Sequence, residues 1–390
     1  AGRGVESMSR GLNRCYNIAR LRERASRRLP APMFHYIDGA AGDEWTMRQN
    51  TDAFDRYELV PRFLVDVSEV DLTTTVFGRE ISMPFFCSPT AMGRLFHPHG
   101  ETGVARAANR AGTMYSLSSI STASIEEVAE ATDGPKLFQV YVFKDRGLNR
   151  EFIQRCKKSG YDALALTVDV PIAGNRERDL VTGMTIPPQL TPASLFNFAM
   201  HPRWVWNYFT NAPLELSNVK DRIKGDVTTL VGFFNDQLDR TVSWDDAAWM
   251  IKEWGGPFAI KGILSVEDAL RAADVGASAV VISNHGGRQL DSSPAPIEVL
   301  PEIVDAVGDR MEVILEGGVR RGVHVLKALA LGATACAAGR PYLYGLGAGG
   351  EAGVDKALDI LKTDIERDIR ILGCRNIKEV DSARIRRVSD

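Results

Sequence analysis

The chain has 390 residues, a formal net charge of −3 at pH 7 and 44% hydrophobic residues. This composition suits a globular core, and the near-balanced charge gives no general attraction to nucleic acid. No uninterrupted apolar run approaches the roughly 18 residues needed to span a bilayer, so we expect any membrane contact to be peripheral. The five cysteines are scattered, odd in number and without metal-ligand spacing, which predicts reduced thiols in a cytoplasmic protein without a metal site.

The start of the chain is rich in arginine. Residues 1–8 are interpreted as a cloning remnant or a processed end, and they are left out of the fold prediction. The arginines between residues 20 and 28 are expected on the solvated face of a first helix, with Ile18, Leu21 and Ala25 on its other face. Residues 9–80 are therefore predicted to form an N-terminal helical segment that completes the active site.

Short β-like runs alternate with amphipathic helical stretches from residue 83 onward. Eight strands in alternation with helices predict a (β/α)8 barrel rather than an open sheet. We expect this barrel to span residues 81–375, with a lid or insertion at 185–240 and a C-terminal tail at 376–390. The predicted strands are residues 84–87, 114–117, 137–142, 163–168, 258–260, 279–282, 313–315 and 333–338.

Polar side chains stand at the C-terminal ends of nearly all the predicted strands. These ends meet at one mouth of a parallel barrel, where barrel enzymes place their chemistry. A purely structural barrel would not need them, so the pattern predicts an active site at this mouth. The residues concerned are Thr90, Ser118, Gln139, Tyr141, Thr167, Asp169, Lys261, Ser283 and His285.

The loop after the sixth strand reads SNHGGRQLD at residues 283–291. His285 supplies a group that carries a proton near neutral pH, and Arg288 supplies a planar fork for a carboxylate. Together they indicate a small acid whose α-carbon is deprotonated or oxidised. A βα turn with a solvated arginine and a helix-capping histidine gives the same local pattern, and the polar ends of the other strands favour the first interpretation.

Glycines followed by arginine stand after the last two strands. Gly317, Gly318 and Arg320 follow the seventh strand, and Gly339 and Arg340 follow the eighth. Backbone N–H groups at helix starts, together with a cation, are the groups that bind phosphate, and barrels commonly hold phosphate at these two loops. The pair predicts a phosphorylated cofactor with one phosphate.

About 90 residues separate the fourth and fifth predicted strands, too many for one helix. Residues 196–209 within this gap are rich in aromatic side chains. Such a segment suits a lid over a site, or a contact of residues 190–235 with a membrane surface or a protein partner. A subdomain that packs its own aromatics against the barrel is an equal alternative.

Six separated motifs resemble the FMN-dependent α-hydroxy-acid oxidase and dehydrogenase family of (β/α)8 flavoproteins. The likeness covers nearly the whole chain, and the segments HYIDGAA at 35–41 and HPRWVWNY at 201–208 are most similar to bacterial respiratory L-lactate dehydrogenases. The motifs are PTAM at 89–92, FQVYV at 138–142, LTVDVP at 166–171, GNRERD at 174–179, SNHGGRQLD at 283–291 and GGVRRG at 317–322.

The resemblance implies roles for the polar residues at the barrel mouth. His285 would be the active-site base, and Asp169 would orient it and stabilise its protonated form. Lys261 would lie beside the flavin edge on which reduction places negative charge. The residues implied to bind the substrate carboxylate and α-hydroxyl are Tyr36, Tyr141, Arg176 and Arg288, and those implied to hold FMN are Pro89, Thr90, Ala91, Ser118, Gln139, Thr167, Ser283, Arg320, Gly339 and Arg340.

Four positions bear on how this chain differs within the family. Glu316 stands where the family usually has Asp near the ribityl chain, so that cofactor contact is shifted. Ile120 and Ile172 are expected to face the pocket and to admit a side chain larger than hydrogen. Ala91 lies by analogy near the reactive face of the flavin and bears on the electron acceptor.

These observations predict an FMN-dependent enzyme that oxidises an L-2-hydroxy acid, with L-lactate to pyruvate as the best guess and a quinone, cytochrome or other acceptor for the electrons. An oxidase that uses O2 and produces H2O2 is the alternative. An isomerase or synthase without net redox, or a non-catalytic flavin-binding module, fits the substrate-type residues less well. The resemblance also implies a homotetramer, with a possible peripheral place on the inner face of the plasma membrane.

Overall fold

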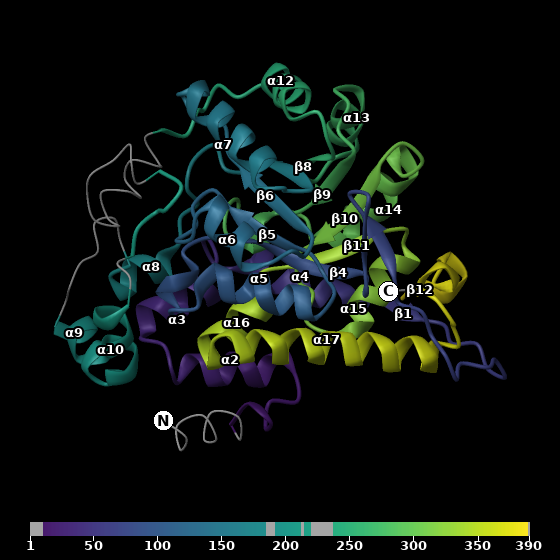
Figure 1. Cartoon of the computed structure of the whole chain (residues 1–390). Helices are drawn as coiled ribbons and strands as arrows, with labels where there is room; N and C mark the ends of the chain where they lie inside the picture. The colour runs from purple at the N-terminus through teal and green to yellow at the C-terminus, as the bar shows by residue number, and fades with distance from the viewer. Residues whose placement is uncertain (1–10, 185–191, 212–213, 220–236, 389–390) are drawn as a thin grey trace.

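The computed structural model describes residues 11–184, 192–211, 214–219 and 237–388. Eight parallel strands in these residues form a closed barrel in the order β10-β11-β4-β5-β6-β7-β8-β9 (Figure 1). The predicted (β/α)8 barrel is therefore confirmed, with the first and last strands of the barrel, β4 and β11, hydrogen-bonded to each other.

Each barrel strand overlaps one of the predicted strands. Their runs of small, branched and aromatic residues are buried on both faces, as expected where helices cover the outside of a barrel. The strands are β4 Phe85–Thr90, β5 Tyr115–Ser118, β6 Lys136–Val140, β7 Ala163–Thr167, β8 Phe258–Ile263, β9 Ala279–Ile282, β10 Glu312–Glu316 and β11 Ala335–Ala338.

The helices around the barrel begin at residues that suit helix starts. Ser124, for example, forms a capping box with Glu127 at the start of α6, and Ser265 accepts the Asp268 N–H at the start of α13. The helices are α5 Gly100–Arg110, α6 Ile125–Ala131, α7 Arg146–Lys158, α12 Trp244–Trp254, α13 Val266–Asp274, α14 Pro296–Val307, α15 Gly322–Ala330, α16 Arg340–Gly349 and α17 Glu351–Leu372.

The N-terminal residues contain helices and short strands. The predicted first helix is α2, and its residues Ile18, Leu21 and Ala25 are buried as expected. Strand β1 pairs antiparallel with β12, which lies at the far end of the chain (Figure 1). The elements are α2 Ile18–Ser26, α3 Ala31–Asp38, α4 Trp45–Asp52, β1 Tyr57–Leu59, β2 Thr74–Val76, β3 Arg79–Ile81 and β12 Ile385–Arg387.

Before α12, the long segment between β7 and β8 contains the described helices α8 Glu177–Thr182, α9 Pro192–Ala199 and α10 Pro202–Thr210. Helix α9 is tied to the N-terminal part through Asn197, whose side-chain oxygen accepts the Ala31 N–H at 2.7 Å. Residues 185–191, 212–213 and 220–236, which fall within the predicted lid or insertion at 185–240 and the predicted membrane contact at 190–235, lie outside the described residues. None of the helices described is long and apolar enough to cross a membrane.

Candidate active site

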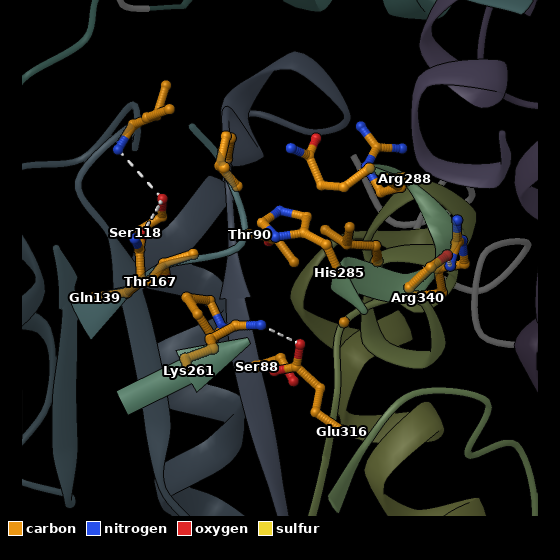
Figure 2. Close-up of a pocket in the computed structure, with 18 of the residues that line it drawn as sticks. Ser88, Thr90, Ser118, Gln139, Thr167, Lys261, His285, Arg288, Glu316 and Arg340 are labelled. Atoms are coloured by element: carbon orange, nitrogen blue, oxygen red, sulfur yellow. Dashed lines mark hydrogen bonds and ion pairs between the residues drawn. The ribbon is translucent and has the colours of Figure 1, made fainter. Parts of the chain in front are cut away.

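A cavity opens at the C-terminal ends of the barrel strands and is lined by most of the predicted site residues (Figure 2). They come from strand ends and loops that are far apart in the sequence, and the closed barrel brings them together. The predicted residues that line it are Tyr36, Pro89, Thr90, Ala91, Ser118, Ile120, Gln139, Tyr141, Thr167, Arg176, Lys261, His285, Arg288, Glu316, Gly317, Gly318, Arg320, Gly339 and Arg340.

Three predicted site residues are not part of this lining. Asp169 and Ser283 lie behind it, where each contacts a residue that faces the cavity. Ile172 is not among the lining residues, so its pocket role stays a prediction. Its side chain is 56% exposed, and its loop is turned so that its carbonyl accepts the Gln289 side-chain N–H at 2.8 Å.

The sequence analysis missed several residues that line the cavity. Ser88 and Gln289 had a signal, because they lie within or beside the polar strand-end motifs. Leu238 had none, because it enters through an isolated antiparallel bridge to Phe143. The missed residues are Ile37, Ser88, Met92, Val170, Ala173, Leu238, Gly286, Gln289, Ala338 and Leu343.

His285 and Asp169 form a direct pair, with 3.1 Å between His285 Nδ1 and Asp169 Oδ1. Gly262 makes room for the carboxylate, since a Cβ there would lie 2.7 Å from the Asp169 Cβ. Burial alone would raise the pKa of Asp169, but the charge and hydrogen bond of His285, with Lys261 further away, leave this pKa below its ordinary value. The carboxylate is therefore ionised and oriented towards the imidazole ring.

Two guanidinium groups gather around Tyr36 at the same end of the cavity. The Arg176 and Arg288 guanidinium carbons lie 5.3 and 4.9 Å from the centre of the Tyr36 ring. Burial, and then the charge of Arg176, lower the pKa of Arg288 to about 10, so it remains a cation at neutral pH. Arg288 donates to the backbone carbonyls of Tyr36 and Gly39 at 2.6 and 3.2 Å.

Tyr141 completes this end of the cavity. Burial, and then the charge of Asp169, raise the pKa of the Tyr141 hydroxyl well above its ordinary value. The hydroxyl therefore stays protonated and can donate a hydrogen bond. Two cations, a neutral phenol and a histidine together suit a small ligand with a carboxylate and a neighbouring hydroxyl.

A second set of polar groups lies deeper, at the ends of β4 to β7. Ser118 Oγ donates to Gln139 Oε1 at 3.0 Å, which leaves the Gln139 amide nitrogen directed away from this bond. That nitrogen, Ser88 Oγ and Thr167 Oγ1 are buried and have no hydrogen-bond partner among the described residues. Because buried polar groups are normally paired, these three predict a bound ligand with several hydrogen-bonding groups.

Lys261 and Glu316 form an ion pair across the floor of the cavity (Figure 2). Ser283 joins them, since its Oγ accepts from Lys261 Nζ at 3.1 Å and donates to Glu316 Oε1 at 3.0 Å. The Glu316 side chain thus reaches the lysine ammonium group.

The glycine-rich loops after β10 and β11 form another part of the cavity lining. Gly318 has a φ of 74° and leaves no space for a side chain, because a Cβ there would lie 1.7 Å from the Asn50 carbonyl oxygen. Arg320 in this loop is partly buried, and this burial lowers its pKa to about 10. Among the described residues, Arg320 and Arg340 form no ion pair, so an anionic ligand would supply the missing charge.

Arg340 has a second role that the sequence did not predict. Its guanidinium group donates to the carbonyls of Ile37, Gly39 and Gly286 at 3.0, 2.8 and 2.8 Å. The side chain therefore fastens the end of α3 to the loop that carries His285. Arg340 is also the first residue of α16, so the start of that helix lies at the part of the cavity that the glycine loops line.

The cavity thus combines buried cations beside glycine loops, unpartnered hydrogen-bonding groups and a histidine–aspartate pair. In a (β/α)8 barrel these features define a flavin-dependent oxidoreductase, and the polar groups fit FMN, with its single phosphate at the glycine loops. A sequence model of the FMN-dependent dehydrogenases matches residues 25–387. The chain belongs to this family, the FMN-dependent α-hydroxy-acid oxidases and dehydrogenases, and its cofactor is FMN.

Curated relatives and solved structures agree with this assignment. Glycolate oxidase from Spinacia oleracea is 41% identical over 361 residues, which is 93% of each chain. The structure of a monotopic membrane protein, (S)-mandelate dehydrogenase, has a TM-score of 0.92 at 36% identity and covers 96% of this chain and 100% of its own. A (putative) lactate oxidase from Pediococcus acidilactici has a TM-score of 0.82 at 32% identity and covers 96% of this chain and 95% of its own.

Proposed function

We propose that the protein oxidises an L-2-hydroxy acid with a small apolar side chain to the 2-oxo acid, and that L-lactate, which gives pyruvate, is its substrate. The observation that carries this proposal is the convergence of Arg176, Arg288 and His285 at one end of the cavity. A substrate carboxylate bound by the two guanidinium groups would bring its α-carbon into the same end of the cavity as the imidazole.

His285 accepts one proton from the substrate during the reaction. It takes this proton from the α-carbon if the electrons pass through a carbanion, and from the α-hydroxyl if the α-hydrogen leaves as hydride. The Asp169 carboxylate stabilises the resulting imidazolium ion and holds the ring through Nδ1. Bound FMN supplies the acceptor for the two electrons.

Arg176, Arg288 and Tyr141 bind and orient the substrate. The two cations hold the carboxylate and stabilise the negative charge that grows as the α-hydrogen leaves. The neutral Tyr141 hydroxyl donates to an oxygen of the substrate. Lys261 stabilises the negative charge that reduction places on the cofactor edge, and Glu316 offsets part of its charge.

The apolar part of the lining supports a substrate with a small side chain. Ala91, Ile120, Val170 and Leu238 all line the cavity. Small aliphatic groups favour a methyl group over hydrogen, because they gain contact area with it. Glycolate and mandelate, which appear in the relatives' names, are the competing substrates. The rate of flavin reduction by each of them, relative to the rate with L-lactate, tests the side-chain preference.

The electron acceptor separates two candidate activities. A dehydrogenase that passes electrons to a quinone or a cytochrome is our first choice, supported by the similarity to the monotopic mandelate dehydrogenase. An oxidase that uses O2 and releases H2O2 is supported by the many relatives that carry the name glycolate oxidase.

One experiment tests both parts of the proposal. The FMN-bound protein is mixed with L-lactate without air, the oxidised flavin absorbance is followed, and then air or a soluble quinone is admitted. Bleaching followed by fast recovery with quinone and slow recovery in air is expected. Fast recovery in air with H2O2 would support the oxidase, and no bleaching would refute lactate and direct the test to mandelate and longer 2-hydroxy acids.

We also propose that helices α9 and α10 contact an anionic membrane surface. Phe196 on α9 and Trp206 and Phe209 on α10 are 69%, 70% and 77% exposed, and Arg203 on α10 is exposed beside them. Large aromatics next to a cation suit the boundary between lipid headgroups and acyl chains. The similarity to a monotopic membrane protein supports the same interpretation.

Co-sedimentation with phosphatidylglycerol vesicles tests this contact. A Trp206→Ser, Phe209→Ser double variant should lose most of the vesicle-bound fraction and keep its rate of flavin reduction. Phe63→Ser is a matched control, because Phe63 is 75% exposed outside these two helices. Equal binding by the double variant and the wild type would refute the contact.

The homotetramer implied by the family resemblance is likewise a proposal. Light scattering during size-exclusion chromatography measures the mass directly, against the 42.8 kDa of one chain.

A further inference from the structure

Helix α4 carries a buried asparagine that pairs with the residue before His285. Asn50 Nδ2 donates to Asn284 Oδ1 at 2.8 Å, and Asn284 Nδ2 donates back to Asn50 Oδ1 at 2.7 Å. Both side chains are at most 4% exposed. Two reciprocal hydrogen bonds away from solvent fix the relative orientation of the two amides, because a rotation of either would leave buried polar groups unpaired.

The backbone that this pair supports has an unusual conformation. His285 has a φ of 58°, and Gly286 and Gly287 follow with 67° and 76°. A histidine in the left-handed region is strained and persists only where neighbouring groups hold it. Asn284 Oδ1 also accepts the Gly287 N–H at 3.1 Å, so the amide that Asn50 orients closes the turn containing His285.

Helix α4 is itself fastened to the loop that follows His285. Asp291 accepts the Thr46 N–H at 2.8 Å and the Trp45 N–H at 3.4 Å, so it caps the first turn of the helix. Glu44, which precedes the helix, makes no such side-chain bond. The same helix is also close enough to the turn that a Cβ on Gly287 would lie 2.6 Å from the Met47 nitrogen.

The C-terminal end of α4 contacts the glycine loop that follows β10. The Asn50 carbonyl lies against Gly318, as described above, and Thr51 Oγ1 donates to the Gly318 carbonyl at 3.3 Å. One residue, Asn50, thus contacts the His285 turn with its side chain and the glycine loop with its backbone.

We propose that Asn50 is a positioning residue that holds His285 in its working orientation and connects that orientation to the loop at the phosphate end of the cavity. The part that concerns catalysis rests on the proposed function. Asn50 does not line the cavity, so it acts through Asn284 and the turn and not through contact with substrate.

Asn50→Leu tests the proposal, because leucine has a similar volume and makes neither hydrogen bond. Asn50→Asp is the second variant if Asn50→Leu does not fold; it keeps the shape and loses the donor to Asn284. Arg48→Gln is the matched control on the exposed face of α4. We expect the rate constant of anaerobic flavin reduction, per bound FMN, to fall about 10- to 100-fold, with the substrate Kd changed less than threefold and FMN still bound.

A substrate α-deuterium isotope effect separates mispositioning from general damage. The effect should be at least as large as in the wild type, because cleavage of the C–H bond becomes the slower step. A variant that loses only stability would show the wild-type rate constant per bound FMN, and that result overturns the proposal.

A crystal structure of FMN-bound Asn50→Leu gives a test that needs no substrate. The His285 turn should be displaced or show two conformers, relative to Arg48→Gln. An unchanged turn with unchanged relative B-factors overturns the proposal. If the wild-type flavin is not reduced by any 2-hydroxy acid, the proposed function fails, and this structural comparison still decides the role of Asn50.

Discussion

Replacing Asp169 by asparagine removes one charge beside His285 and changes almost nothing in size. The two side chains are 3.1 Å apart, so an imidazolium ion and this carboxylate attract each other by about 5 kcal/mol at an effective dielectric constant of roughly 20. Because 26% of the His285 side chain meets solvent, we discount this to about 2–3 kcal/mol. That loss of stabilisation should slow flavin reduction by roughly 30- to 150-fold.

The assay is anaerobic stopped-flow reduction of the FMN-bound Asp169→Asn variant at saturating L-lactate. The substrate Kd and the FMN affinity should stay within about threefold of the wild type, since Asp169 lies behind the cavity lining. Asp305→Asn, which removes a charge from the exposed face of α14, is the matched control. A rate constant for Asp169→Asn within threefold of the wild type would refute the electrostatic argument.

Three further predictions concern single side chains. His285→Gln should bind FMN and abolish its reduction by L-lactate, and rapid anaerobic reduction of this variant would remove His285 from the role of base. Glu316→Gln should raise the flavin midpoint potential, because the Lys261 charge is then no longer shared; an unchanged potential in a dye-coupled titration would contradict this. Asp38→Asn should cost about 2 kcal/mol of unfolding free energy at pH 7. Burial opposes ionisation of Asp38, but Arg22, Tyr344 and Arg178 lower its pKa from 3.8 to about 2. Its contribution is thus present above about pH 4 and lost as the pH falls through 2. Urea unfolding from pH 7 to below pH 2 should show that the stability difference between the two proteins shrinks below about pH 4.

The barrel could be predicted from the sequence because each strand is buried on both faces. Such strands read as short continuous apolar runs, and their polar ends mark the mouth of the barrel. The ends of the strands were predicted less accurately. Strand β6, for example, was predicted at 137–142 but ends at Val140. Beyond that residue the chain leaves the barrel ladder while its apolar character continues through Val142.

The parts of the site that escaped prediction depend on contacts between distant segments. Leu238 reaches the cavity through a bridge formed after a long insertion, and Asn50 meets Asn284 across 234 residues. Neither has a local pattern that differs from an ordinary loop or helix residue.

The anchoring of α3 by Arg340 has a consequence for the order in which the protein is assembled. Tyr36 is synthesised early. The backbone carbonyls of Ile37 and Gly39, at the end of the same helix, accept hydrogen bonds from Arg340, which is synthesised some 300 residues later. The barrel also closes only when β11 pairs with β4. A nascent chain on the ribosome would therefore lack both the substrate-binding part and the phosphate-binding part of the cavity until β11, the last barrel strand, has left the ribosome. We therefore expect FMN to enter after synthesis is nearly complete, as the ligand of a finished barrel.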